Sequence, residues 1–183
     1  MNYARIVGKI LKRDRRPGQY VYIVRTQRSG SKVVHDDMYI VMNRYVKMRF
    51  GEIYEFIGKL GVFQRGRSKI FDTCVYVDEV YEVLPDTECF SEVEITGTII
   101  DKISNENVAN KILLILNADD DSYSQYKVSA WNRRVSYIKY KQIGDPIHIL
   151  GELVSFTFKE GTKIKTQTEI VFWEEPQMDE RSD

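Results

Sequence analysis

The sequence repeats itself, and no other feature constrains its fold as strongly. A shift of 89 residues places residues 6–10 (IVGKI) on residues 95–99 (ITGTI), so that both read Ile-x-Gly-x-Ile. The same shift matches Asn-Arg at 43–44 with Asn-Arg at 132–133. Further matches follow in the same order at slightly larger shifts, as loop insertions in the second copy would produce: Gly51 with Gly144, 57–60 with 150–153, and 75–77 with 170–172. This ordered set predicts two copies of one domain of roughly 85 residues.

The repeat divides the chain into a first domain at 1–84, a linker at 85–91, a second domain at 92–175 and a flexible acidic tail at 176–183. In each copy, β-branched stretches between turn residues predict five short strands, and the glycine of Ile-x-Gly-x-Ile is expected at a bulge or tight bend. A polar stretch with weak helical character follows each third strand. The expected fold class is all-β: two tandem OB-folds, five-stranded Greek-key barrels, each with a short helix between strands 3 and 4.

Composition narrows the class of protein further. Hydrophobic residues make up 43% and charged residues 30%, which is typical of a globular chain, and no apolar run approaches the roughly 20 residues of a membrane span. The two cysteines, without a CxxC pair, indicate a cytoplasmic protein with no zinc site. His35 and His148 have no nearby partners for catalysis, and the run Asp119–Asp121 is expected to be an acidic surface turn. We therefore expect no enzyme, metal or other cofactor.

Charge is divided unequally between the halves. Residues 1–86 carry a net charge of +6 and the remainder −6, although the total is zero. Two interpretations stay open. The basic half has a polyanionic partner, or the halves neutralise each other within or between molecules.

The second copy resembles the bacterial single-stranded DNA-binding protein (SSB) family. The stretches that carry the resemblance are ITGTIID, LLILNAD, YKVSAWNRRV, IGDPIHILGELVSF and GTKIKTQTEIV, with Gly144, Gly151, Leu153, Thr168 and Glu169 at matching places. The resemblance covers roughly residues 93–173, and the first copy joins it only through the repeat. It implies a non-enzymatic protein that binds single-stranded DNA along a groove by stacking and phosphate contacts. A tandem of two barrels departs from the usual single-barrel bacterial member.

Alternation along the third strand of the second copy assigns its faces. Tyr126, Val128 and Ala130 should enter the barrel, which leaves Trp131 outside with Lys127 and Ser129. A large aromatic on a polar, basic face is what base stacking needs, and the resemblance places the family's aromatic at Trp131. The alternative is that Trp131 packs against a partner or under a loop.

When the first copy is aligned with the second at the shift of 89 residues, the outer-face positions of the third strand are apolar. They predict a protein interface at Met38, Ile40 and Met42. The stacking candidates of this copy are Tyr20, Tyr22, Tyr45 and Phe63, with half-buried packing as the alternative for each.

Basic residues could bind phosphates, because an OB-fold binds through its loops between strands 1 and 2 and between strands 4 and 5. Both loops of the first copy carry basic clusters, and the second copy is poorer. The candidates are Lys12, Arg13, Arg15, Arg16, Arg65, Arg67, Lys69, Lys127, Arg133, Lys163 and Lys165.

Two functions follow from these features. The first is sequence-independent binding of single-stranded DNA, in replication, recombination or mobile-element DNA metabolism, by a homodimer with four OB-folds and with replication proteins as possible partners. The second is a protein-interaction accessory module of a replication or conjugation complex. RNA as the ligand also stays open, because the sequence shows no feature that would recognise the 2′-hydroxyl group. No membrane partner is expected.

Overall fold

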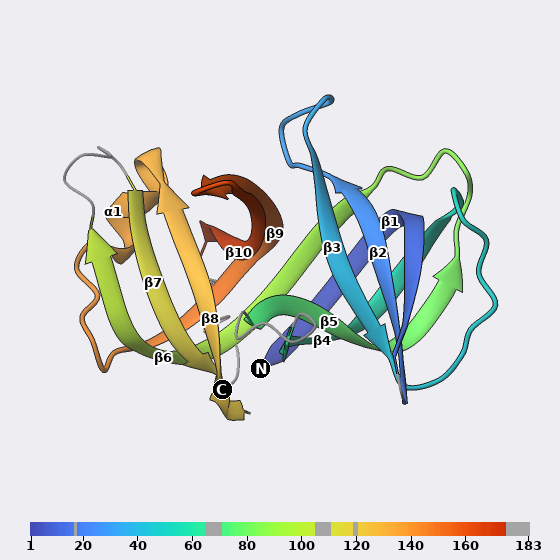
Figure 1. Ribbon diagram of the computed structural model, residues 1–183. Helices are drawn as coiled ribbons and strands as arrows, with labels where there is room; N and C mark the ends of the chain where they lie inside the picture. Colours follow the sequence, from blue (N-terminus) through green and yellow to red (C-terminus); the bar gives the residue numbers. More distant parts are fainter. Residues whose placement is uncertain (17, 65–70, 105–110, 119–120, 175–183) are drawn as a thin grey trace, which may run out of the picture.

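Strands make up nearly all the regular secondary structure of the described residues, as the sequence predicts. The computed structural model describes residues 1–16, 18–64, 71–104, 111–118 and 121–174 (Figure 1). Its first half contains β1 (Asn2–Arg16), β2 (Gln19–Gln27), β3 (His35–Met42), β4 (Ile53–Gln64) and β5 (Phe71–Glu82). These strands pair in the order β1-β2-β3-β5-β4 and then return to β1, with β3 and β5 parallel. The ring is a closed five-stranded barrel, which we call the first barrel.

The second half closes in the same order of pairing. It contains β6 (Phe90–Ser104), β7 (Lys111–Ala118), β8 (Asp121–Trp131), β9 (Pro146–Glu160) and β10 (Lys163–Glu174). They pair as β6-β7-β8-β10-β9 and return to β6, again with one parallel pair, β8 with β10. We call this ring the second barrel.

The helices expected after the third strands differ between the barrels. The second barrel has a 3₁₀ turn, η1 (Asn132–Arg134), and then a single α-helical turn, α1 (Val135–Ile138). In the first barrel the expected helix is absent, because residues 43–52 form an irregular segment that ends in a turn. That segment is four residues shorter than its counterpart at 132–145, a difference of about one helical turn. No helix among the described residues is long and apolar enough to cross a membrane.

The glycine of each Ile-x-Gly-x-Ile motif lies where two strands approach closely. A Cβ at Gly8 would come 2.7 Å from the carbonyl oxygen of Arg25, and one at Gly97 would come 2.3 Å from that of Asn117. The register shifts just beyond both glycines, between Ile10 and Lys12 in β1 and between Ile99 and Asp101 in β6. The expected bulge thus lies three residues beyond each glycine, where it increases the bend that closes the barrel.

The matched glycines at the ends of the connections occupy equivalent places. Gly51 donates its amide to the carbonyl of Ile10 at 2.9 Å, and Gly144 donates to that of Ile99 at 2.8 Å. Both glycines have positive φ, 83° and 95°, a region that disfavours other residues. The repeat read from the sequence is therefore correct at these positions.

The third strands do not follow the predicted shift of 89 residues. In the parallel pairs, Ile40 lies beside Val75 and Val128 beside Ile170, so Ile40 corresponds to Val128 at a shift of 88 residues. A slip of one residue exchanges the two faces of a strand. The structural counterpart of Trp131 is therefore Asn43, which directly follows the first copy's third strand.

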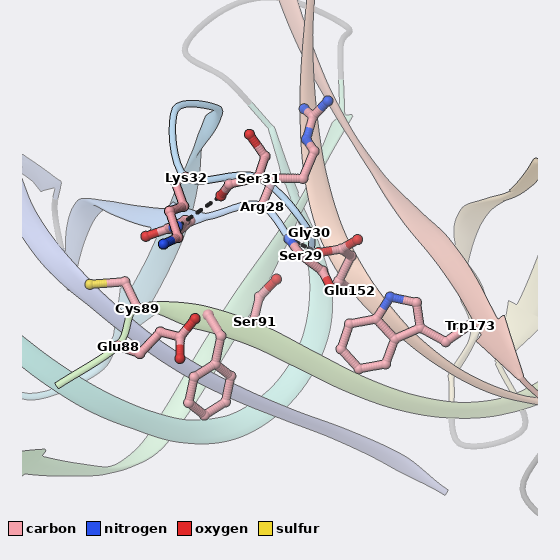
Figure 2. A pocket seen from close by; sticks show the side chains of 12 residues that line it. Arg28, Ser29, Gly30, Ser31, Lys32, Glu88, Cys89, Ser91, Glu152 and Trp173 are labelled. Atoms are coloured by element: carbon pink, nitrogen blue, oxygen red, sulfur yellow. Dashed lines mark hydrogen bonds between the residues drawn. The ribbon is translucent and has the colours of Figure 1, made fainter.

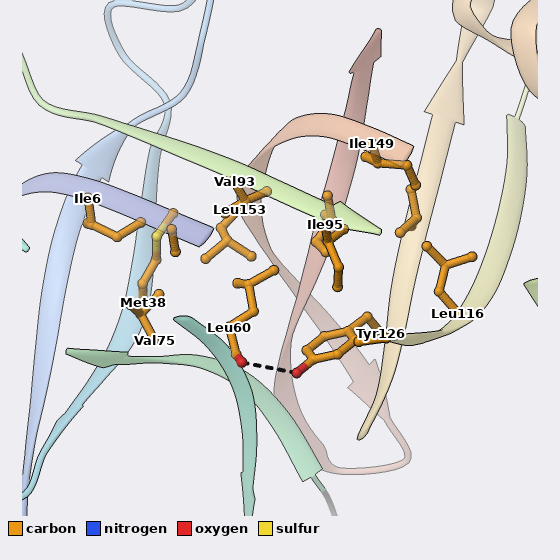
Figure 3. Packing of buried hydrophobic residues seen from close by; sticks show 14 of the residues in the cluster. Ile6, Met38, Leu60, Val75, Val93, Ile95, Leu116, Tyr126, Ile149 and Leu153 are labelled. Atoms are coloured by element: carbon orange, nitrogen blue, oxygen red, sulfur yellow. Dashed lines mark hydrogen bonds between the residues drawn. The ribbon is translucent and has the colours of Figure 1, made fainter. Parts of the chain in front are cut away.

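This slip overturns the predicted protein interface at Met38, Ile40 and Met42. Their exposed fractions are 1%, 0% and 2%, and all three belong to the hydrophobic core. They point into the barrel, as Tyr126, Val128 and Ala130 do in the second barrel. One continuous cluster of buried residues runs through both barrels (Figure 3).

The barrels are joined edge to edge by main-chain hydrogen bonds. Residues 2–7 of β1 pair antiparallel with residues 90–95 of β6, so all ten strands form one sheet. Beside this seam, the buried hydroxyl of Tyr126 donates to the carbonyl of Leu60 at 3.1 Å, from the second barrel to the first (Figure 3). The side chain of Asn2 also bonds the main chain of Leu60, as donor at 3.0 Å and as acceptor at 2.8 Å.

A second contact between the barrels is polar. The buried carboxylate of Asp36 binds Arg28 at 2.6 Å and accepts the amide of Ser155 on β9 at 2.8 Å. The Arg28 guanidinium also donates to the carbonyl of Ser155 at 3.1 Å. A buried carboxylate with this many donors holds the end of the first barrel's β2–β3 hairpin against β9.

We predict that Gly97→Ala destabilises the protein by at least about 2 kcal/mol, because the new Cβ meets main chain that cannot move aside. Urea denaturation followed by circular dichroism measures the loss. The matched control is Gly30→Ala, which has a positive φ of 74° but open space around it, and which should cost about 1 kcal/mol. A smaller effect at Gly97 than at Gly30 would contradict the close approach.

Candidate nucleic-acid interface

Trp131 ends β8 on the outer face of the second barrel, as the alternation predicts. Its side chain is half-buried, and its indole N–H donates to the hydroxyl of Ser129 at 3.2 Å. Lys111 is its partner across the strand pair, and the Lys111 ammonium lies 4.4 Å from the centre of the indole ring. The site thus combines a partly open aromatic ring with a cation.

Neighbouring side chains extend this site toward the first barrel. The Lys111 ammonium lies 3.7 Å from the carboxylate of Glu169 and 5.7 Å from the ring centre of Phe156. The guanidinium of Arg28, from the first barrel, lies 5.4 Å from the same Phe156 ring. Arg28 is held by Asp36, and this hydrogen bond raises the pKa of Arg28 above its ordinary value. Two aromatic rings and two cations, each cation paired with a carboxylate, therefore lie together where the barrels meet.

The first barrel has an aromatic and basic cluster of its own. Tyr20, at the start of β2, and Tyr45, in the connection after β3, have ring centres 5.5 Å apart at an angle of 55°. The guanidinium of Arg13 lies 5.6 Å from the Tyr45 ring, which is 54% exposed. The structure thus brings together three residues that the sequence singled out separately, and it leaves Tyr45 accessible.

Tyr22 differs from its predicted role as a stacking residue. Its ring is 2% exposed and belongs to the core, because Tyr22 pairs with the inward-facing Ile40. Burial raises the pKa of Tyr22, and a hydrogen bond with Arg13 opposes this rise. The hydroxyl also contacts the carbonyl of Val46 at 3.4 Å. Tyr22 therefore supports the connection that carries Tyr45 and offers no ring face to a ligand.

The remaining predicted residues divide into two groups. Lys12 and Arg133 are exposed and Lys127 is half-buried, so these three can contact a ligand. The others stay predictions, because residues 65–70 and several strand side chains lie outside the described part. They are Arg15, Arg16, Phe63, Arg65, Arg67, Lys69, Lys163 and Lys165.

Three residues of this interface were not singled out from the sequence: Lys111, Phe156 and Arg28. Lys111 opens the second strand of its copy, and pairing that strand with YKVSAW would have placed it opposite Trp131. For Phe156 and Arg28 the sequence holds no comparable signal, because their meeting depends on how the barrels dock.

A pocket of about 430 Å³ also lies between the barrels (Figure 2). Its walls come from the β2–β3 hairpin, the segment before β6, and the side chains of Glu152 and Trp173. The amide of Ser29 donates to the Glu152 carboxylate at 3.0 Å. Because Arg28 and Lys32 face Glu88 and Glu152 across this pocket, it does not have the single sign of charge that a polyanion requires.

No protein-family profile matches the sequence, and no curated protein matches it. The structure, however, is similar to the wild-type single-stranded DNA-binding protein from Thermus aquaticus, with a TM-score of 0.69 over 100% of this chain and 96% of that one. A deletion mutant of the same protein gives a TM-score of 0.72 over 98% and 96%. The fold is SSB-like. Sequence identity is 15% in both comparisons, so this similarity concerns the fold alone.

We predict that Lys111→Ala increases acrylamide quenching of Trp131 fluorescence by about twofold, because the lysine covers one of two ring faces. Measuring it in a Trp173→Phe background leaves Trp131 as the only tryptophan. The control is Lys139→Ala, a lysine that lies over Tyr140 instead. Unchanged quenching in Lys111→Ala would mean that the ammonium does not cover the indole.

Proposed function

We propose that this protein binds single-stranded DNA without sequence preference, through two tandem OB-folds that arose by duplication. The two barrels close in the same strand order, and the SSB-like fold occurs in a protein that is named for this activity. Binding of this kind needs aromatic surfaces for the bases and cations for the phosphates.

The pairing of Trp131 with Lys111 carries this proposal. A half-buried indole beside an ammonium, on an otherwise polar strand face, can stack one base and contact the adjoining phosphate. The cluster of Tyr20, Tyr45 and Arg13 offers the same chemistry on the first barrel. Because every base has a flat π-face, stacking of this kind accepts any sequence.

The alternative, a protein-interaction accessory module, has lost its main support. It rested on an exposed stripe of Met38, Ile40 and Met42, and these side chains lie in the core. The rest of our proposal consists of expectations from the sequence. They are a non-enzymatic cytoplasmic protein, a homodimer with four OB-folds, contacts with replication proteins, and a role in replication, recombination or mobile-element DNA metabolism.

We expect Trp131→Ala to weaken binding of an oligo(dT) of about 35 nucleotides roughly tenfold, because one stacked base contributes about 1–3 kcal/mol. Fluorescence anisotropy of a labelled oligonucleotide measures the affinity at several salt concentrations. The salt dependence should stay unchanged, since no phosphate contact is removed. Trp173→Phe, which alters the other tryptophan, is the matched control and should bind as the wild type does. Failure of the wild-type protein to bind oligo(dT) at low salt would refute the function.

Unlike Trp131→Ala, we expect Arg13→Gln to change the salt dependence of binding. Removing one phosphate contact should make the negative slope of log K against log salt less steep by about 0.7. The exposed Lys59, on another face of the first barrel, provides the control as Lys59→Gln. Equal slopes for Arg13→Gln and the wild type would show that Arg13 does not contact a phosphate of the bound strand. Repeating the titration with oligo(U) tests whether RNA is an equal ligand.

A further inference from the structure

The connection between β8 and β9, residues 132–145, exposes an unusual set of side chains. Tyr137, Tyr140 and Ile143 are 59%, 76% and 63% exposed. Five aromatic side chains among the described residues are strongly exposed, and four of them lie in this connection or in its first-barrel counterpart: Tyr45, Phe50, Tyr137 and Tyr140. Accessible rings are thus concentrated in the segments that follow the third strands.

The same connection is strongly basic. Arg133, Arg134, Lys139 and Lys141 lie between residues 132 and 144, and no acidic residue occurs there before Asp145. The ammonium of Lys139 lies 4.6 Å from the ring centre of Tyr140. Together they repeat the combination of ring and cation seen at Trp131 and Lys111.

Three contacts fix this connection on the barrel. The fully buried Ile138 anchors α1 in the core, and the Tyr137 ring packs edge-on against Phe172 at 6.1 Å. The Lys102 ammonium donates to the carbonyls of Ile138, Lys139 and Lys141 at 3.3, 2.6 and 2.7 Å. The rings are therefore presented from a fixed backbone, which lowers the entropy lost on binding.

The sign of the charge and the position of the connection select its ligand. A symmetric contact between two copies would bring the two basic surfaces face to face, which like charges oppose. A polyanion with flat bases fits both the cations and the rings. The connection also begins directly after Trp131 and leads to α1 at the outer end of the second barrel (Figure 1).

We propose that residues 132–144 form a second contact surface for the same single strand, which continues from Trp131 over the end of the barrel. This inference rests on the proposed function and adds a path to it. A short oligonucleotide occupies one site at a time, at Trp131 or at the cluster of Tyr20, Tyr45 and Arg13, and only a longer one continues from Trp131 to Tyr140 and Lys139. The loss of the contacts at residues 132–144 should therefore reduce the affinity for long oligonucleotides and leave that for short ones unchanged.

The test compares the double variant Tyr140→Ala/Lys139→Gln with the wild type, using labelled oligo(dT) of about 8 and about 35 nucleotides, lengths chosen around the site size of one OB-fold. We expect the affinity for the long strand to fall about tenfold and that for the short strand to stay unchanged. Tyr81→Ala is the matched control, because Tyr81 is also exposed but bonds the carboxylate of Glu79, which repels phosphate.

Three results would overturn the inference while the wild type binds both strands. They are an unchanged affinity for the long strand, an equal loss for both lengths, and a change of oligomeric state in sedimentation that marks the surface as a protein contact. A wild-type protein that binds neither strand would instead refute the proposed function, and the inference with it. Thermal unfolding verifies that the double variant is folded, as expected for two exposed side chains.

Discussion

Main-chain pairing between β1 and β6 is the interaction on which the rest of the structure depends. Residues 4–7 of β1 lie between β4 and β6, so the strand that closes the first barrel also bonds the second. The part of β1 that does not pair with β2 is covered by β6 of the other barrel, so the seam has no unpaired strand edge. The core continues through the seam, and the Asp36 network fixes the barrels at a second point. Arg28 can reach Phe156 only because both contacts hold the barrels in one orientation.

Much of the fold could be predicted because the repeat carries physical requirements. Gly8 and Gly97 recur where no Cβ fits, and Gly51 and Gly144 recur at positive φ beside the same strand position. The backbone conformation requires glycine at these positions, so the glycines recur in both copies. They allow the copies to be aligned although the other side chains differ. A closed five-stranded barrel follows from strand order and length, both of which the sequence displays.

The errors came from positions where the alignment was supported by side chains alone. The shared Asn-Arg at 43–44 and 132–133 suggested a shift of 89 residues for the third strand, but the hydrogen-bonded pairing requires 88. Since strand faces alternate, this small error moved three core residues to the surface. The position of Trp131 was predicted correctly because its own alternation, independent of the repeat, determined it. Its neighbours Phe156 and Arg28 come from other strands and another barrel, which no local pattern encodes.

The edge-to-edge seam has a consequence for how a ligand would be accommodated. Two barrels joined by a shared sheet cannot swing about a hinge without breaking consecutive main-chain hydrogen bonds. A nucleotide chain that contacts both must therefore adopt the contour of the protein, and the conformational entropy is lost by the polymer. Polymers whose bases are already stacked on one another would have to unstack first, so adenine-rich strands should be modestly poorer ligands than thymine-rich ones, a difference that arises in the strand and needs no base-specific contact.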